Sequence, residues 1–257
     1  MMTHILLTND DGVNAPGLLA LFKEIRKLGE VTVFAPDRNW SASGHVKTMH
    51  RPLRVKEVQL ADGTGAYASD GAPSDCVALA LLGYIDKKID LVVSGINPNG
   101  NFGHDVTYSG TVTAALEAVI HGVPGIAVSL DSPDNYLGIL DFKPAARAAH
   151  HVASIFLEQG FPPEIAINVN VPFLDGNPIK GMRITRQGLR VYRDQLVSRE
   201  DPRKQPYYWI GGEAPTGILE EGTDYGAVKD GYVSITPIKL DLTAYEIIES
   251  LQDLKWE

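Results

Sequence analysis

The stretch ILLTNDDG, residues 5–12, is a short apolar run that ends in a polar, acidic turn. Its apolar half, Ile5–Leu7, predicts a buried β-strand. Pro16 suits the first turn of a helix, apolar residues then recur at helical spacing, and Gly29 predicts the helix end. Residues 31–35 (VTVFA) predict a second strand. The chain therefore opens with a β-α-β unit, whose two strands run parallel.

The same alternation continues to about residue 171. The expected strands are 53–58 and 66–68, which form a hairpin-like pair, then 91–93, 125–130 and 165–171. The expected helices run from a cap at Ser74 or Asp75 to about residue 84, then over 111–121 and 143–159. Short apolar strands separated by helices are typical of a doubly wound, mostly parallel sheet. We therefore predict a Rossmann-like α/β fold, with a single domain over residues 1–257.

From about Pro172 the rhythm changes. Residues 182–185, 207–210 and 232–235 predict strands, with no helices between them. Thr243 and Glu246 match the T-x-x-E capping box and predict a final helix to about Leu254. We interpret this part as a β-rich C-terminal extension, in which about 172–240 form an extended arm that pairs with another subunit.

Composition narrows the class of protein. Of the 257 residues, 44% are hydrophobic and 21% charged, and the formal net charge is −9. No apolar run approaches the roughly 20 residues that span a bilayer, and the first residues lack a signal-peptide pattern. The single cysteine, Cys76, excludes an intrachain disulfide framework and is expected to be buried. We predict a cytoplasmic protein with no membrane partner and no nucleic-acid polymer as partner, because an acidic chain repels one.

Oxygen-bearing residues follow three of the predicted strands. They are Asn9, Asp10 and Asp11 after the first strand, Ser41, Ser43 and Gly44 after the second, and Asn97 after the strand at 91–93. The carboxyl ends of parallel strands meet at one edge of a sheet, where ligands bind. Two adjacent carboxylates suit a hard divalent cation such as Mg²⁺ or Mn²⁺, which also removes their mutual repulsion. The alternative is a plain turn with solvated carboxylates.

A second group of candidates precedes the helix at 111–121. Ser109-Gly110-Thr111 would place free N–H groups and a positive dipole end toward a phosphate, although a simple helix cap has the same pattern. His45 and His104 lie in neighbouring loops and are candidate proton donors. G-x-G-x-x-G after the first strand, G-K-[ST] and G-x-S-x-G are all absent. That absence argues against dinucleotide oxidoreductases, P-loop NTPases and α/β-hydrolases.

Six ordered stretches resemble one known family. They are ILLTNDDG (5–12), APDRNWSASGH (35–45), GAPSDCVALAL (71–81), SGIN (94–97), DVTYSGTV (105–112) and GYVSITP (231–237). Together they are similar to the SurE family, stationary-phase survival proteins with 5′/3′-nucleotidase activity. Each stretch is modest alone, but the set spans nearly the whole chain and is highly specific.

The resemblance implies one divalent metal ion per subunit, Mg²⁺ or Mn²⁺, held by Asp10, Asp11, Ser41 and Asn97. It also implies that Ser109, Gly110, Thr111 and Asn101 contact the phosphate of a small nucleotide, and we expect Asn9, Ser43 and Gly44 to face the same substrate. The family hydrolyses nucleoside 5′- and 3′-monophosphates, some members also short polyphosphate, and assembles as homodimers or homotetramers, partly through exchange of C-terminal segments. Here the family loop S-G-I-N-x-G-x-N-x-G is altered: Asn99 stands where glycine is usual, and Gly100 comes one position later.

The function predicted from these residues is metal-assisted hydrolysis of a phosphomonoester, with Asp10 and Asp11 as catalytic carboxylates. A non-catalytic nucleotide-binding protein with a stress or regulatory role is the alternative. A receiver-like signalling module fits less well, because it needs a phospho-accepting aspartate at the end of a later central strand. The candidate positions here are Pro36-Asp37 and Ser94-Gly95.

Overall fold

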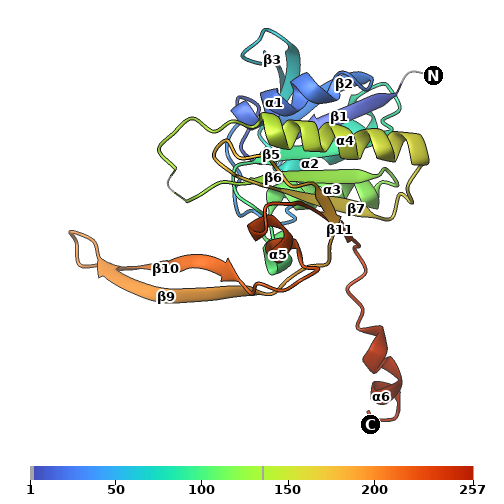
Figure 1. Cartoon of the computed structure of the whole chain (residues 1–257). Helices are drawn as coiled ribbons and strands as arrows, with labels where there is room; N and C mark the ends of the chain where they lie inside the picture. The colour runs from blue at the N-terminus through green and yellow to red at the C-terminus, as the bar shows by residue number, and fades with distance from the viewer. Residues whose placement is uncertain (1–2, 135, 257) are drawn as a thin grey trace.

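A nine-stranded mixed sheet forms the centre of the molecule in the part of the chain that the computed structural model describes, residues 3–134 and 136–256 (Figure 1). Its strand order is β3-β4-β2-β1-β5-β6-β7-β11-β8. The strands are β1 (His4–Thr8), β2 (Glu30–Pro36), β3 (Val55–Gln59), β4 (Gly65–Ser69), β5 (Leu91–Asn97), β6 (Gly125–Asp131), β7 (Ala166–Pro172), β8 (Met182–Ile184) and β11 (Val233–Ile238).

Strand β1 lies where the direction of winding reverses. It pairs in parallel with β2 on one side and with β5 on the other. The chain first moves outward from β1 to β2 and later returns to β5, from which β6 and β7 continue in parallel. Antiparallel pairing joins β3 to β4 and β11 to β7. Ligand crevices of open α/β sheets lie beyond the strand ends at such a reversal, so the topology points to the loops that follow β1 and β5.

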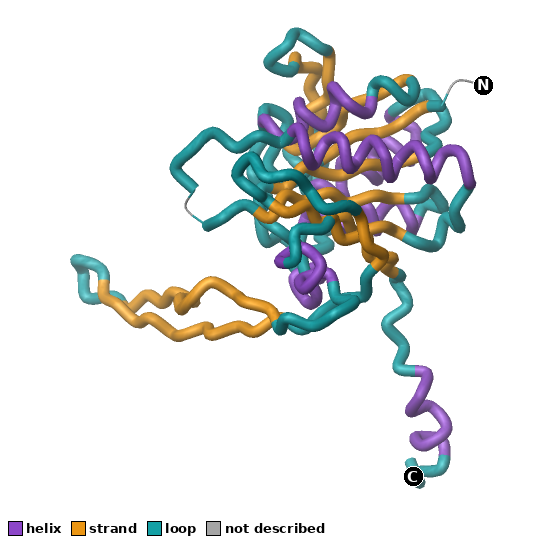
Figure 2. The backbone as a smooth tube through the Cα atoms, viewed as in Figure 1, coloured by secondary structure: helices purple, strands orange, loops and turns teal. Residues whose placement is uncertain are grey.

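Helices cover both faces of the sheet (Figures 1 and 2). Helices α1 (Pro16–Ile25) and α4 (Lys143–Gln159) pack on one face, and α2 (Pro73–Leu79) and α3 (Gly110–Ile120) on the other. Successive side chains of a strand point to opposite faces. Accordingly Ile5 and Leu7 join the core under α1 and α4, while Leu6 packs with the fully buried Cys76 of α2. The predicted doubly wound α/β fold is confirmed.

The start of helix α2 differs from prediction. Helix α2 begins at Pro73 with Ala72 as its N-cap, and Asp75 accepts the N–H of Ala72 at 2.9 Å. The expected cap at Ser74 or Asp75 was therefore misplaced, because a proline at the first helical position moved the start toward the N-terminus. After α2, residues 80–84 continue as a short π-helical segment.

Among the described residues, no helix has the length and apolar character needed to cross a bilayer.

The C-terminal part contains elements that the sequence pattern did not predict. Helix α5 (Asp224–Lys229) lies between β10 (Pro206–Gly217) and β11, where we expected no helix. Its six residues are too few for a helical period to show, and its cap is Thr223, whose hydroxyl accepts the N–H of Gly226 at 3.1 Å. Strand β9 (Arg190–Glu200) was also missed, because most of its side chains are exposed and polar and it is held by its ladder to β10.

The predicted capping box at the C-terminus is wrong. The N–H of Thr243 donates to Asp241 at 2.9 Å, a helical turn follows at Tyr245–Ile247, and α6 covers only Ile248–Gln252. Within residues 172–240, predicted to form an arm, β8 and β11 belong to the main sheet, and β9 and β10 form a separate two-stranded sheet. The β9–β10 hairpin, Arg190–Gly217, projects away from the body, and so does the segment that carries α6 (Figures 1 and 2).

Candidate metal and phosphate site

The turn after β1 places Asp10 and Asp11 at the edge of the sheet. Asp10 is almost completely buried, and burial raises the pKa of its carboxyl, opposed by a hydrogen bond that the Thr111 hydroxyl donates. Burial, and secondly the neighbouring charge of Asp10, raises the pKa of Asp11 to about 7. Two partly desolvated carboxylates that repel each other are stabilised by a cation bound between them.

The loop after β2 closes over this acidic turn. The N–H of Trp40 donates to the backbone oxygen of Asp10 at 2.7 Å. Asn39 joins two predicted ligands: its Nδ2 donates to Asp11 Oδ1 at 3.4 Å, and its Oδ1 accepts the N–H of Ser41 at 2.7 Å. The sequence reasoning did not single out Asn39, although it lies within the quoted stretch 35–45. It holds the Ser41 loop against the aspartates.

The loop after β5, residues 97–103, forms another wall of the cavity that contains Asp10 and Asp11. Asn97 donates its amide N–H to the backbone oxygen of Asn99, which leaves its carboxamide oxygen available to a ligand. The buried Asn101 donates its backbone N–H to Asn170 Oδ1 at 2.8 Å. Its carbonyl oxygen accepts the side-chain N–H groups of Asn168 and Asn170 at 2.8 and 3.0 Å. Two asparagines of β7, Asn168 and Asn170, therefore hold the backbone of Asn101 in the middle of this loop. The sequence pattern did not predict this role for them.

The displaced glycine of this loop has a packing reason. A Cβ at Gly100 would lie 2.2 Å from the ring of Phe102, which is itself only 2% exposed. A side chain at position 100 would force Phe102 to move, so packing accounts for the glycine at this position.

The start of α3 lies directly against Asp10. The Ser109 hydroxyl caps the helix by accepting the N–H of Val112 at 3.1 Å. A Cβ at Gly110 would lie 2.8 Å from Asp10 Cβ and 3.2 Å from Ser43 Oγ. That Ser43 hydroxyl is buried and has no hydrogen-bond partner among the described residues. An unpartnered buried hydroxyl beside a helix start and a carboxylate fits a site that takes a further polar ligand.

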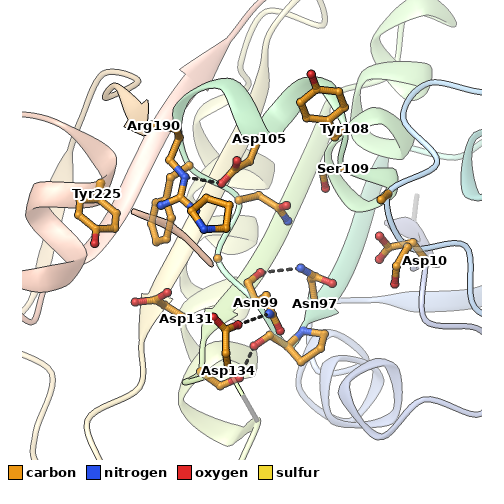
Figure 3. Close-up of a pocket in the computed structure, with 18 of the residues that line it drawn as sticks. Asp10, Asn97, Asn99, Asp105, Tyr108, Ser109, Asp131, Asp134, Arg190 and Tyr225 are labelled. Atoms are coloured by element: carbon orange, nitrogen blue, oxygen red, sulfur yellow. Dashed lines mark hydrogen bonds and ion pairs between the residues drawn. The ribbon is translucent and has the colours of Figure 1, made fainter. Parts of the chain in front are cut away.

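A cavity of about 500 Å³ joins these elements (Figure 3). The predicted site residues that line it are Asp10, Asp11, Ser41, Asn97, Asn101 and Ser109. The predicted residues outside its lining are Asn9, Ser43, Gly44, Gly110 and Thr111. Asn9 instead holds the acidic turn, since its side chain exchanges hydrogen bonds with Gly12 at 3.0 and 3.2 Å. Thr111 and Gly110 contact Asp10, and Ser43 lies beside Gly110, so these three residues border the site without lining the cavity.

The two histidines proposed as proton donors lie apart from the cavity. His45 Nε2 is 2.7 Å from Glu117 Oε2, on the third turn of α3, and His104 is exposed. The described residues that line the cavity include neither.

The far side of the cavity comes from segments that the sequence reasoning did not connect with the site. Arg190 at the base of the hairpin lies 2.7 Å from Asp105, and Lys229 of α5 lies 2.7 Å from Asp131 at the end of β6. Tyr225 of α5 also lines this side. Residues so distant in sequence share no local motif, and only the tertiary fold brings them together.

The donor set fits a hard divalent cation. The side chains available beside Asp10 and Asp11 are a hydroxyl at Ser41 and a carboxamide oxygen at Asn97, all oxygen ligands of the kind that Mg²⁺ and Mn²⁺ prefer. No cluster of three or more histidine, cysteine, aspartate or glutamate side chains suited to a metal occurs among the described residues. That pattern is compatible with a cation held by few carboxylates and completed by water.

Comparison with known proteins then decides the family. The family model described as "Survival protein SurE" matches residues 5–194. The chain belongs to the SurE family. The match covers the β1, β2 and β5 loops and the start of α3, whereas Tyr225 and Lys229 on the far side of the cavity lie beyond it.

Similar SurE proteins cover the full length of the chain. A protein of Chloroflexus aggregans named 5′-nucleotidase SurE is 50% identical, over 99% of this chain and 100% of its own length. One of Herpetosiphon aurantiacus with the same name is 52% identical, over 98% of each chain. The crystal structure of the SurE protein from Aquifex aeolicus is 41% identical, with a TM-score of 0.80 over 97% of this chain and 98% of that one.

Proposed function

We propose that this chain is a metal-dependent 5′-nucleotidase, which hydrolyses nucleoside 5′-monophosphates to nucleoside and phosphate. The observation that carries the proposal is the close approach of the α3 start to Asp10, with Ser41 and Asn97 on the same cavity. The cavity thus has oxygen ligands for a cation, and the start of a helix, the end that favours an anion, lies beside it. The names of the similar proteins from Chloroflexus aggregans and Herpetosiphon aurantiacus agree with this activity.

The charge of the cavity supports the metal. Five carboxylates line it (Asp10, Asp11, Asp105, Asp131 and Asp134), against the two basic side chains of Arg190 and Lys229 among the described lining residues. A phosphate dianion entering this cavity is repelled unless a cation neutralises the aspartates. Asp10, Asp11, Ser41 and Asn97 would hold that cation. When bound, it supplies neutralisation of phosphate charge and acidification of a water molecule.

The chain's own residues supply orientation. Thr111 holds the Asp10 carboxylate through its hydroxyl, and in the proposed reaction Asp10 and Asp11 orient the attacking water. The α3 start, capped by Ser109, stabilises the phosphate oxygens as charge builds on them. The oxygen of water bonds to phosphorus, the bond from phosphorus to the nucleoside oxygen breaks, and a proton reaches that oxygen. Since His45 and His104 do not line the cavity, we assign that proton to water.

The wider proposal adds hydrolysis of 3′-monophosphates and of short polyphosphate, in a homodimer or homotetramer of the cytoplasm. A reducing compartment suits a chain with one cysteine. The β9–β10 hairpin exposes Leu196, Tyr208, Trp209 and Ile210 by 61–86%, and large apolar side chains exposed on both faces of a projecting hairpin fit an interface. A second copy of the chain would cover it.

Phosphate release from a panel of 5′- and 3′-monophosphates and tripolyphosphate tests the activity, with Mn²⁺ or Mg²⁺ and then with chelator. We expect turnover of a 5′-monophosphate that needs the metal. Absence of turnover on every monophosphate with metal present would overturn the enzyme and favour a nucleotide-binding protein. Asp10→Asn should abolish turnover and keep the thermal stability, whereas Asp62→Asn, on an exposed turn, serves as the matched control.

A further inference from the structure

We propose that the far side of the cavity, formed by Tyr225 and Arg190, is the seat of the substrate's nucleobase. The inference rests on the proposed function and names the part of the cavity that distinguishes a nucleotide from other phosphomonoesters. Figure 3 shows Tyr225 and Arg190 on the side opposite to Asp10 and Ser109, with Asn97 and Asn99 between them. A nucleotide whose phosphate lies at the α3 start would therefore extend its nucleoside toward Tyr225.

Tyr225 presents an aromatic side chain with free surface to the cavity. It is partly exposed, whereas the neighbouring Phe102 is only 2% exposed. The two rings meet edge to face, with centroids 5.4 Å apart and an interplanar angle of 87°. The guanidinium carbon of Arg190 lies 5.5 Å from the Tyr225 centroid, and Lys229 Nζ lies 5.1 Å from it. Nucleobases stack on aromatic rings such as that of tyrosine and on the planar guanidinium of arginine.

The seat is held rigidly. The fully buried carboxylate of Asp224 accepts the N–H groups of Gly103 and Gly188, both at 2.8 Å, which fixes the start of α5 to the wall and to the hairpin base. A Cβ at Gly217 would come within 2.5 Å of the Tyr225 ring, so the ring rests directly on the hairpin backbone. Rotation of the ring away from its place is therefore restricted, which reduces the entropy lost on binding.

The charges on this side favour an uncharged group. Arg190 is paired with Asp105, which also accepts the Tyr192 hydroxyl at 2.7 Å, and Lys229 is paired with Asp131. Each cation is thus already neutralised, so this side offers no excess positive charge for a second phosphate. A flat, polarisable and neutral group satisfies both the paired charges and the aromatic ring, and the nucleobase is the part of a nucleotide that has these properties.

Two substrates that differ only in the base test the proposal: adenosine 5′-monophosphate, and ribose 5-phosphate, which lacks it. For Tyr225→Ala, we expect kcat/KM for the nucleotide to fall about 5- to 150-fold, the loss that corresponds to one stacked base. The value for ribose 5-phosphate should stay within about twofold. Tyr225→Phe, which keeps the ring, should retain most of the nucleotide activity.

Tyr232→Ala is the matched control, because Tyr232 also has a cation over its ring, Arg183 at 3.5 Å, but lies outside the described lining of the cavity. It should change neither kinetic value. Equal losses on both substrates in Tyr225→Ala, or no loss on either, would overturn the seat. If the wild type turns over neither substrate, the nucleotidase proposal fails. Calorimetric binding of the two compounds to wild type and Tyr225→Ala then decides the seat by the same selective loss.

Discussion

Replacing Gly110 with alanine tests whether the close approach of α3 to Asp10 organises the site. The added Cβ would lie 2.8 Å from Asp10 Cβ, 3.1 Å from Asp10 Oδ2 and 3.2 Å from Ser43 Oγ. Carbon atoms in ordinary contact are about 3.5–4.0 Å apart. Either the helix start or Asp10 must therefore move by about 1 Å, and the Thr111 hydrogen bond to Asp10 opposes a movement of the carboxylate alone.

The size of the effect follows from that displacement. A misplacement of about 1 Å at reacting groups costs about 10²-fold in rate. Overpacking of a tight interior costs about 1–3 kcal/mol of stability. We therefore expect kcat for a nucleoside 5′-monophosphate to fall about 100-fold, while the melting temperature falls by only a few degrees.

The assay is steady-state phosphate release with saturating Mn²⁺, beside a thermal melt of the same sample. Gly65→Ala is the matched control, since it adds the same methyl group on β4 where no atom lies within 4 Å and the backbone φ is negative. It should change neither quantity. A Gly110→Ala enzyme with wild-type kcat and melting temperature would show that the contact between α3 and Asp10 does not position the carboxylate.

Three further perturbations test separate parts of the structure. Because the folded state raises the pKa of Asp11 from 3.8 to about 7, its protonated form favours folding. The metal-free protein should therefore lose stability as pH rises from about 4 through 7, and Mn²⁺ should raise the melting temperature more at pH 8 than at pH 5. Asp11→Asn should weaken both the pH dependence of the stability and the pH dependence of the Mn²⁺ effect. Asn170→Ala leaves the Asn101 N–H without its partner. The free energy of unfolding, measured by denaturant titration, should therefore fall by about 1–3 kcal/mol, and KM should rise. Asn177→Ala, at an exposed asparagine, should change neither quantity. Trp209→Lys, on the exposed hairpin, should shift the sedimentation of the protein toward the monomer; an unchanged oligomer would place the interface elsewhere.

The core of the fold could be predicted because its signals are local. The apolar run of β1, the proline at the start of α1 and the glycine after it each identify their elements within a few residues. The hairpin and α5 could not be predicted in the same way. Strand β9 buries little and is defined by hydrogen bonds to a strand several residues further on, and α5 is shorter than two helical turns.

The residues of the candidate site also differ in whether local sequence signals predict them. Asp10, Asp11, Ser41 and Asn97 each follow a strand, so the rule that parallel strands end at a common edge was enough to group them, and the structure places all four on one cavity. Tyr225 and Arg190 reach that cavity through tertiary contacts, among them those of the buried Asp224 carboxylate with Gly103 and Gly188 and the ion pair of Arg190 with Asp105. No spacing of residues in the sequence predicts contacts between segments so far apart.

The distribution of charge connects the two sides of the cavity. At the β1 turn two carboxylates lie beside each other without a basic partner among the described side chains, whereas on the Tyr225 side each cation has its own carboxylate. The first side gains most from a divalent cation and, through it, from a phosphate. The second side gains little from further charge but much from a stacked ring. A molecule that carries its whole charge at one end and a neutral aromatic group at the other satisfies both conditions, and a nucleoside monophosphate is such a molecule.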